Sequence, residues 1–311
     1  MSKKSRILVF MVVLLSVVTL SACSTGTKTD TKEETGGATV VEQAVNDYFA
    51  NMPADIYKID QVAFVDKVKA GETMTILDIR SADSYAQGHI KGAISMPWGP
   101  TLAASLTKIP NDKPVMVYCV TGQTAGQTVA ILNVAGFDAK SVNLGWNLGI
   151  SKVDGVDAVI ETTPNVFDAS TNTAIDADIL TATTDYYTGL EAVAGTTYAN
   201  YKITEDNAKA ALDAKDDSII FLDVRKAEDF AKGHIEGAVS IPFGNGMETQ
   251  FSTLPMDKTI IVYCYTGQTA GQTVAGLRLL GYDAVSLNSG AGTASTGTAG
   301  WINKGYPLVT N

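Results

Sequence analysis

Short apolar runs alternate with amphipathic segments along most of this chain. In its first half, the apolar or β-branched runs of strand length are residues 75–79, 93–96, 114–118 and 140–143. Residues 81–87 and 124–134 lie between these runs and have a helical pattern, and the second helix is expected to end at Gly136. Strands that alternate with helices in this way predict an α/β fold with a mainly parallel sheet.

The pattern occurs twice, at an offset of 145 residues. Residues 117–130 read VYCVTGQTAGQTVA and residues 262–275 read VYCYTGQTAGQTVA, so 13 of 14 positions are identical. Upstream, Tyr57-Lys58-Ile59 matches Tyr201-Lys202-Ile203 after a one-residue shift. Downstream, the second copy carries a ten-residue insertion rich in glycine, alanine, serine and threonine. The repeat predicts two similar domains.

The N-terminal residues have the features of an export signal. Three cationic residues within positions 3–6 precede an apolar run at 7–20, which is shorter than the ~20 residues of a membrane-spanning helix. The run ends in Leu-Ser-Ala before Cys23, which resembles a bacterial lipobox. We therefore expect a lipoprotein anchored through Cys23 on the extracytoplasmic face of the bacterial cell membrane. An ordinary secretory signal with an incidental cysteine is the alternative.

These features give a complete domain assignment. We expect a lipoprotein signal peptide at 1–22, a flexible tether at 23–40, a first domain at 41–165, a linker at 166–185 and a second domain at 186–311. The tether follows from the polar composition after Cys23, which cannot bury enough apolar surface to order itself.

The charge and the cysteines narrow the function. The formal charge is −10, and removing residues 1–22 with their three positive charges makes it −13, which disfavours nucleic acid as a partner. Besides Cys23, each repeat holds one cysteine, so the chain has no pairs for structural disulfides within a domain. No group of histidine, cysteine and aspartate has metal-ligand spacing, and we expect neither a metal nor a cofactor.

The two cysteines, Cys119 and Cys264, each lie between a strand and a glycine-containing turn that opens a helix. The first N–H groups of a helix have no partner within the helix, so they can surround an anion. Such a turn can stabilise a thiolate, or the persulfide made from it. A buried cysteine that acts only as a small apolar residue is the alternative, and its placement in the same loop of both copies disfavours it.

The ordered motifs L-D-[IV]-R, G-H-I-x-G-A, a proline and [VI]-Y-C-x-x-G-x-T resemble the rhodanese (sulfurtransferase) family. The resemblance covers residues 56–149 and 200–308. It implies two domains, each with a mainly parallel five-stranded sheet flanked by helices, and no cofactor. It also implies that Cys119 and Cys264 are nucleophiles, which take a sulfane sulfur from a donor and pass it to a thiophilic acceptor. The expected partners are a small sulfur donor and acceptor, or a protein thiol as acceptor.

The resemblance also implies which residues surround the sulfur. The substrate-binding residues are expected to be Val120, Thr121, Gly122, Gln123 and Thr124 in the first copy, and Tyr265, Thr266, Gly267, Gln268 and Thr269 in the second. Supporting residues are expected to be the ion pairs Asp78–Arg80 and Asp223–Arg225 and the histidines His89 and His234. For the histidines, a bond to backbone is favoured over general-base catalysis. Trp98 and Phe243 are candidates for a pocket wall, and Gln127 and Gln272 are expected on a solvated helix face.

Neither loop contains an arginine or lysine, unlike many active loops of this family. On an acidic protein, a neutral loop is expected to bind dianionic thiosulfate weakly, which favours persulfide or polysulfide donors. Besides an enzyme, the chain can be a persulfide carrier or sensor with little turnover. A thiol–disulfide function is disfavoured because neither cysteine has a resolving cysteine nearby.

Overall fold

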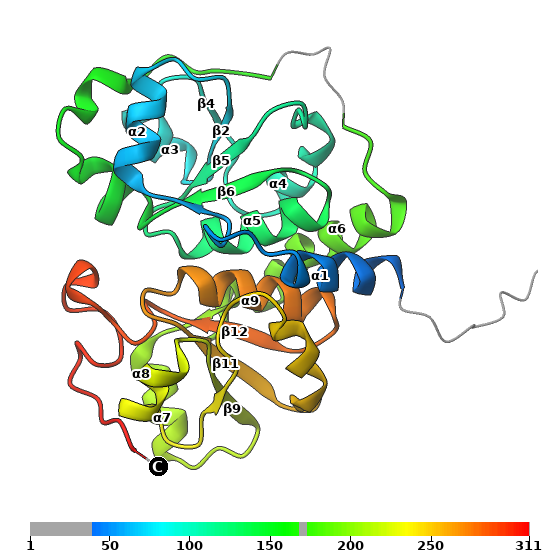
Figure 1. Cartoon of the computed structure of the whole chain (residues 1–311), viewed down its shortest axis with the longest axis vertical. Helices are drawn as coiled ribbons and strands as arrows, with labels where there is room; N and C mark the ends of the chain where they lie inside the picture. The colour runs from blue at the N-terminus through cyan, green and yellow to red at the C-terminus, as the bar shows by residue number, and fades with distance from the viewer. Residues whose placement is uncertain (1–38, 168–172, 311) are drawn as a thin grey trace, which may run out of the picture. The chain divides into compact units, whose positions relative to one another are not determined.

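The computed structural model describes residues 39–167 and 173–310. The expected signal peptide, the expected lipidation site Cys23 and nearly all of the expected tether lie outside the described residues. Within the described ranges, the chain forms two parallel five-stranded sheets with helices around them, as Figure 1 shows. The predicted fold class is confirmed. No helix in these ranges is both long and apolar enough to span a membrane.

The first sheet has the strand order β1-β6-β5-β2-β4, and every neighbouring pair is parallel. Its strands are β1 (Lys58–Ile59), β2 (Thr75–Asp78), β4 (Ala93–Ser95), β5 (Val115–Tyr118) and β6 (Ala139–Val142). The two central strands, β2 and β5, are buried along their whole length. This burial on both faces explains why they read as continuous apolar runs in the sequence.

The second sheet repeats this topology with the order β10-β9-β11-β12-β8, again all parallel. Its strands are β8 (Lys202–Ile203), β9 (Ile219–Asp223), β10 (Val239–Ser240), β11 (Thr259–Tyr263) and β12 (Ala284–Leu287). Each strand of this sheet has its counterpart in the first, so the sequence repeat is also a repeat of structure.

The helices surround each sheet in matching positions. They are α2 (Gln61–Lys69), α3 (Ala82–Gln87), α4 (Pro100–Ala103) and α5 (Gln123–Val134) in the first domain, and α7 (Glu205–Asp213), α8 (Ala227–Lys232) and α9 (Gln268–Leu279) in the second. Side-chain caps fix where two of them begin. Asp60 accepts the N–H groups of Val62 and Ala63 at the start of α2, and Thr204 accepts the N–H of Asn207 at the start of α7.

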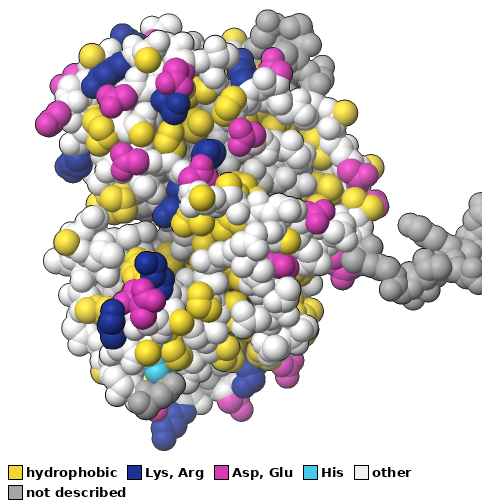
Figure 2. All heavy atoms as spheres, in the orientation of Figure 1, with side chains coloured by type: hydrophobic (Ala, Val, Ile, Leu, Met, Phe, Trp, Pro, Cys, Tyr) yellow, Lys and Arg dark blue, Asp and Glu magenta, His cyan; other side chains and the backbone are white. Residues whose placement is uncertain are grey.

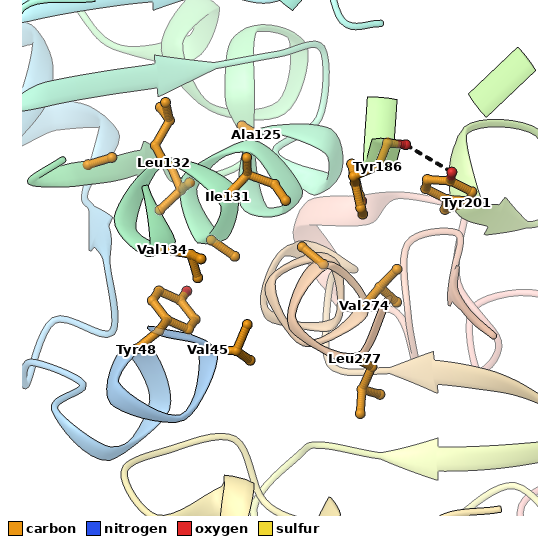
Figure 3. Close-up of a cluster of buried hydrophobic side chains, with 14 of the residues drawn as sticks. Val45, Tyr48, Ala125, Ile131, Leu132, Val134, Tyr186, Tyr201, Val274 and Leu277 are labelled. Carbon is orange, nitrogen blue, oxygen red and sulfur yellow. Dashed lines mark hydrogen bonds between the residues drawn. The ribbon is translucent and has the colours of Figure 1, made fainter. Parts of the chain in front are cut away.

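Helices α5 and α9 pack directly against each other, so the two domains share one hydrophobic core (Figure 3). Glycines make this close approach possible. A Cβ at Gly126 would overlap the carbonyl oxygen of Gln268, and a Cβ at Gly271 would overlap that of Gln123. The repeated GQTAGQT segment therefore has two roles, because its start forms the cysteine loop and its later residues form the contact between domains.

The expectation that Gln127 and Gln272 lie on a solvated face is wrong. Both side chains are fully buried between the domains. The amide oxygen of Gln127 accepts the hydroxyl of Tyr186, and that of Gln272 accepts the hydroxyl of Tyr48. Burial of an unpaired amide costs about 1–3 kcal/mol in folding free energy. The hydrogen bonds from these tyrosines offset that cost for the two glutamines. The sequence pattern of one helix cannot show that a second domain covers its polar side.

Two further helices pack against the domain that does not follow them in the sequence. Helix α1 (Val40–Ala50) precedes the first domain, yet its Phe49 packs edge-on against Phe251 of the second. Helix α6 (Ala177–Val193) precedes the second domain, and its Tyr187 packs against Trp98 of the first. The expected linker at 166–185 is thus helical from Ala177 onward. This exchange fixes the domains against each other, and therefore fixes what each domain presents to the other's cysteine.

Candidate active site

Each cysteine follows the carboxyl end of a central strand, and its sulfur accepts backbone N–H groups. Cys119 follows β5, and its Sγ lies 3.1 Å from the N of Gly122 and 3.4 Å from the N of Ala125. Cys264 follows β11, and its Sγ lies 3.2 Å from the N of Gly267. The helices α5 and α9 begin directly after these glycines. Their unpaired N–H groups favour a negative charge on either sulfur.

The loop glycines have a conformation that other residues adopt only with strain. Gly122 has φ of 93° and Gly267 has φ of 88°, and each precedes the first residue of its helix. This turn folds the chain back over the cysteine, so that the N–H groups face the sulfur. Cys119 is 3% exposed and Cys264 is 2% exposed, so a substrate reaches them only through the mouth of the loop.

A second glycine in each copy packs against the backbone of the cysteine loop. Gly145 and Gly290 have φ of 59° and 57°, and a Cβ on either would overlap the carbonyl oxygen of the cysteine. The residue after each glycine donates its N–H to that same oxygen, at 2.8 Å for Cys119 and 2.7 Å for Cys264. The cysteine loop is therefore held on both sides by backbone, which preorganises its donors.

A cavity of about 480 Å³ lies beside Cys264. Tyr265, Thr266 and Thr269 of the expected substrate-binding loop line it, and so does Phe243, which was a candidate for the pocket wall. The insertion found only in the second copy adds Thr293 and Ser295, which carry hydroxyl groups. These residues add polar groups to a largely apolar pocket next to the sulfur of Cys264.

The loop itself has no cationic side chain, as the sequence shows, but the cavity beside it does. Lys226 of the second domain and Lys58 of the first both line the cavity beside Cys264. Burial lowers the pKa of Lys58, while a negative charge on Cys264 acts in the opposite direction. The sequence-based interpretation considered only the loop, whereas one lysine comes from a neighbouring strand-end segment and the other from another domain. Lys58 has a counterpart in the second copy, Lys202, and this repetition was the signal available in the sequence.

The two loop glutamines, Gln123 and Gln268, reach across to the opposite domain. The amide nitrogen of Gln123 donates to the hydroxyl of Ser286 and to the carbonyl oxygen of Leu287. The amide nitrogen of Gln268 donates to the Oγ of Ser141 at 2.8 Å. Gln268 also lines the Cys264 cavity. Because both side chains are buried and hydrogen-bonded, they position the loops on the neighbouring domain rather than project freely toward a substrate.

The expected ion pairs are buried. The Arg80 guanidinium lies 2.6 Å from the Asp78 carboxylate and 2.7 Å from the carbonyl oxygen of Gly88. Arg225 makes the same two contacts, to Asp223 at 2.6 Å and to Gly233 at 2.7 Å. These bonds tie the end of a central strand to the turn after the next helix, which is a structural role.

The histidines also bond to backbone. His89 is fully buried, stacks on Tyr85, and has its Nδ1 2.8 Å from that residue's carbonyl oxygen. His234 stacks on Phe230, and its Nδ1 lies 3.0 Å from the carbonyl oxygen of Phe230. These contacts favour the structural interpretation of both histidines. Within residues 39–167 and 173–310, no group of histidine, cysteine, aspartate and glutamate could hold a metal ion.

Several known proteins resemble this chain in sequence. Residues 61–151 and 204–294 match the family model described as Rhodanese-like domain. A sulfurtransferase of Allochromatium vinosum is 28% identical over 96 residues, which cover 31% of this chain and 83% of that protein. The thiosulfate sulfurtransferase PspE of Escherichia coli is 34% identical over 62 residues, which cover 20% of this chain and 60% of that protein. The crystal structure of SseA from Escherichia coli, titled as a 3-mercaptopyruvate sulfotransferase, is 17% identical, with a TM-score of 0.35 and coverage of 75% and 97%.

Proposed function

Since this chain belongs to the rhodanese-like domain family, we propose that it transfers sulfane sulfur through persulfides on Cys119 and Cys264. The observation that carries the proposal is that each sulfur accepts at least one backbone N–H group at the start of a helix, two at Cys119 and one at Cys264. These donors stabilise a thiolate before the reaction and a persulfide anion after it. Because the same arrangement occurs twice, both cysteines are expected to react.

In the first half-reaction, the cysteine thiolate attacks the outer sulfur of the donor. A bond forms between Sγ and that sulfur, and the donor's own bond to it breaks. The leaving group takes the electron pair, as sulfite from thiosulfate or as a thiolate from a persulfide. In the second half-reaction, an acceptor such as cyanide or a thiol attacks the outer sulfur of the cysteine persulfide. The thiolate is regenerated, and no electrons are gained or lost overall.

The location is part of the proposal. We propose that a lipid on Cys23 holds the protein on the extracytoplasmic face of the bacterial membrane. The support is the order of the cationic residues, the apolar run and the small residues before this cysteine. Stable attachment to a membrane needs two or more lipid chains, and these can all be carried by one residue. Donors and acceptors would then come from outside the cytoplasm, and a protein thiol is one such acceptor.

The alternative is a carrier or sensor that holds persulfide without turnover. The neutral loop sequences favoured this alternative, but the lysines beside Cys264 remove that argument. A turnover assay distinguishes the two. With thiosulfate or a small alkyl persulfide as donor and cyanide as acceptor, we expect many molecules of thiocyanate per protein. Release that stops at two or fewer per chain would favour the carrier and contradict the enzyme.

A further inference from the structure

A lysine of each domain lies at the cysteine site of the other domain. Lys58, in β1 of the first domain, lines the cavity of Cys264 in the second. Lys202, in β8 of the second domain, is the repeat counterpart of Lys58, and a negative charge on Cys119 acts to raise its pKa. Lysine and arginine side chains are visible where the two domains meet on the face in Figure 2. The relation is reciprocal, because the domains have the same topology and face each other through α5 and α9.

Hydrogen bonds define this placement in both halves. Lys58 is the register partner of Ser141 in the pairing of β1 with β6. The Oγ of Ser141 accepts the side chain of Gln268, the residue that begins α9 after the Cys264 loop. The second half has the same chain of contacts, because Lys202 is the register partner of Ser286, and Ser286 accepts the side chain of Gln123. Each cysteine loop is thus attached to the strand beside the opposite lysine.

Both lysines lack a partner for their charge. Within the residues that the structure describes, neither ammonium group has a carboxylate within 4.0 Å or a hydrogen bond. Some other lysines of this acidic chain do have one, and Lys140 and Lys209 are paired with aspartates. Lys58 and Lys202 are also partly buried, and burial lowers the pKa of both. A partly buried cation without a partner is unfavourable unless an anion binds to it.

Resting on the sulfur-transfer function proposed above, we propose that Lys58 and Lys202 each bind the anionic end of a donor at the cysteine of the other domain. In thiosulfate, the transferred sulfur meets the thiolate, and the remaining oxygens carry the charge that leaves as sulfite. The loop N–H groups hold the sulfur, and the opposite lysine holds those oxygens. Each active site is then complete only when both domains are present.

The two sites differ in one residue that matters for a dianion. Lys226 also lines the Cys264 cavity, and its counterpart in the first domain, at the 145-residue offset, is Ser81. The Cys264 cavity therefore has two lysines, one from each domain, of which Lys226 is exposed and lies 3.8 Å from the carboxylate of Glu228. We expect Cys264 to use dianionic donors better than Cys119, because each added cation strengthens the interaction with the donor's charge.

The test uses two full-length chains that each keep one reactive cysteine. Cys119→Ser leaves only Cys264, and Cys264→Ser leaves only Cys119. Lys58→Met or Lys202→Met is added to each, and thiocyanate release is measured with thiosulfate and with a small alkyl persulfide. The bound persulfide carries a single charge, on the transferred sulfur, and negative charge reaches its alkyl thiolate only as that group leaves. This singly charged donor is therefore expected to depend on the lysine less than dianionic thiosulfate does.

We expect a crossed pattern. Lys58→Met should lower kcat/KM for thiosulfate roughly 10- to 100-fold in the Cys264-only chain and change the rate with alkyl persulfide by less than about threefold. It should leave the Cys119-only chain unaffected, whereas Lys202→Met should act only there. Lys58→Arg should retain most of the thiosulfate activity, because it keeps the charge. Equal losses with both donors, or no loss with thiosulfate, would overturn the proposal.

A measurement without turnover separates this proposal from the proposed function. Sulfate, an unreactive dianion, should slow the alkylation of Cys264 by iodoacetamide in the Cys264-only chain, and Lys58→Met should remove this protection. If protection depends on Lys58 but neither donor gives thiocyanate, the anion site stands and the enzyme function is wrong. If turnover occurs but sulfate protects equally with and without Lys58, the lysine proposal is wrong and the enzyme function stands. Exposed Lys91→Met should change neither measurement.

Discussion

A chain carrying both Cys119→Ser and Cys264→Ser should lose thiocyanate formation almost completely. A serine hydroxyl is neither ionised near neutral pH nor able to form a persulfide, so no sulfur can be passed on. The loss should be roughly 10³-fold or more, because the nucleophile is removed rather than weakened. Initial rates of thiocyanate release with thiosulfate and with an alkyl persulfide provide the measurement.

The single variants are the matched controls for this experiment. Each retains one complete site, so each should keep measurable activity, and the two activities should add up to about that of the unaltered protein. Serine has nearly the same shape as the buried cysteine that it replaces. The two single variants should therefore have similar thermal unfolding temperatures. A double variant that works as fast as the unaltered chain would show that neither cysteine is the nucleophile.

The second large effect is expected at the contact between the domains. Gly271→Ala places a Cβ where the carbonyl oxygen of Gln123 lies, at the closest approach of α9 to α5. Overpacking of this kind costs about 1–3 kcal/mol, and a clash with backbone falls at the upper end because backbone cannot move aside. The alanine regains up to about 1 kcal/mol of helix propensity. We expect a net loss of about 2 kcal/mol in the free energy of unfolding, measured by urea titration.

Gly195→Ala is the control for this variant. Gly195 has no atom within 4 Å of its Cβ position and lies outside the contact between the domains. Its replacement should leave stability within about 0.5 kcal/mol, as for most surface substitutions. Gly271→Ala should also lower thiosulfate turnover more than alkyl persulfide turnover, because the displaced domains carry Lys58 away from Cys264. A variant as stable as the control would contradict the close packing of α5 and α9.

Local sequence patterns predicted the elements of the fold well. The apolar run at 114–118 became the buried strand Val115–Tyr118, and the helical pattern at 124–134 became the helix Gln123–Val134. These features depend on residues that are neighbours in the chain, where propensity and burial act together. The cysteine loop was predictable for the same reason, since strand, turn and helix start are contiguous.

Contacts between the domains were not predictable in this way. Gln127 has a polar side chain in the middle of a helix, and the groups that hydrogen-bond with it in the interior, Tyr186 and Asn200, lie far from it in the sequence. Lys58 lies far from Cys264 in the sequence, so a search of the loop alone found no cation. The expectation that thiosulfate binds weakly assumed that no cationic side chain lies near the sulfur. At Cys264 this assumption fails, because Lys58 and Lys226 line the cavity.

The repeat nevertheless contained a usable signal. Lysine occurs at the same place in Tyr57-Lys58-Ile59 and Tyr201-Lys202-Ile203, in strands of only two residues at the edge of each sheet. An edge strand this short contributes little to the core, so a lysine kept in both copies suggests a role outside the domain's own packing. The proposed role agrees with the structure, because Lys58 lines the cavity of Cys264 and each cysteine loop bonds to the strand beside the opposite lysine.

Mass spectrometry of the two cysteine peptides after brief exposure to thiosulfate tests most directly whether this chain works through sulfur bound to Cys119 and Cys264. Alkylation traps each persulfide with its extra sulfur atom in place. We expect this added sulfur on both peptides, with more on the peptide of Cys264, and its disappearance when cyanide is added. Two cysteines that are alkylated without any added sulfur, from thiosulfate and from alkyl persulfide alike, would contradict the account.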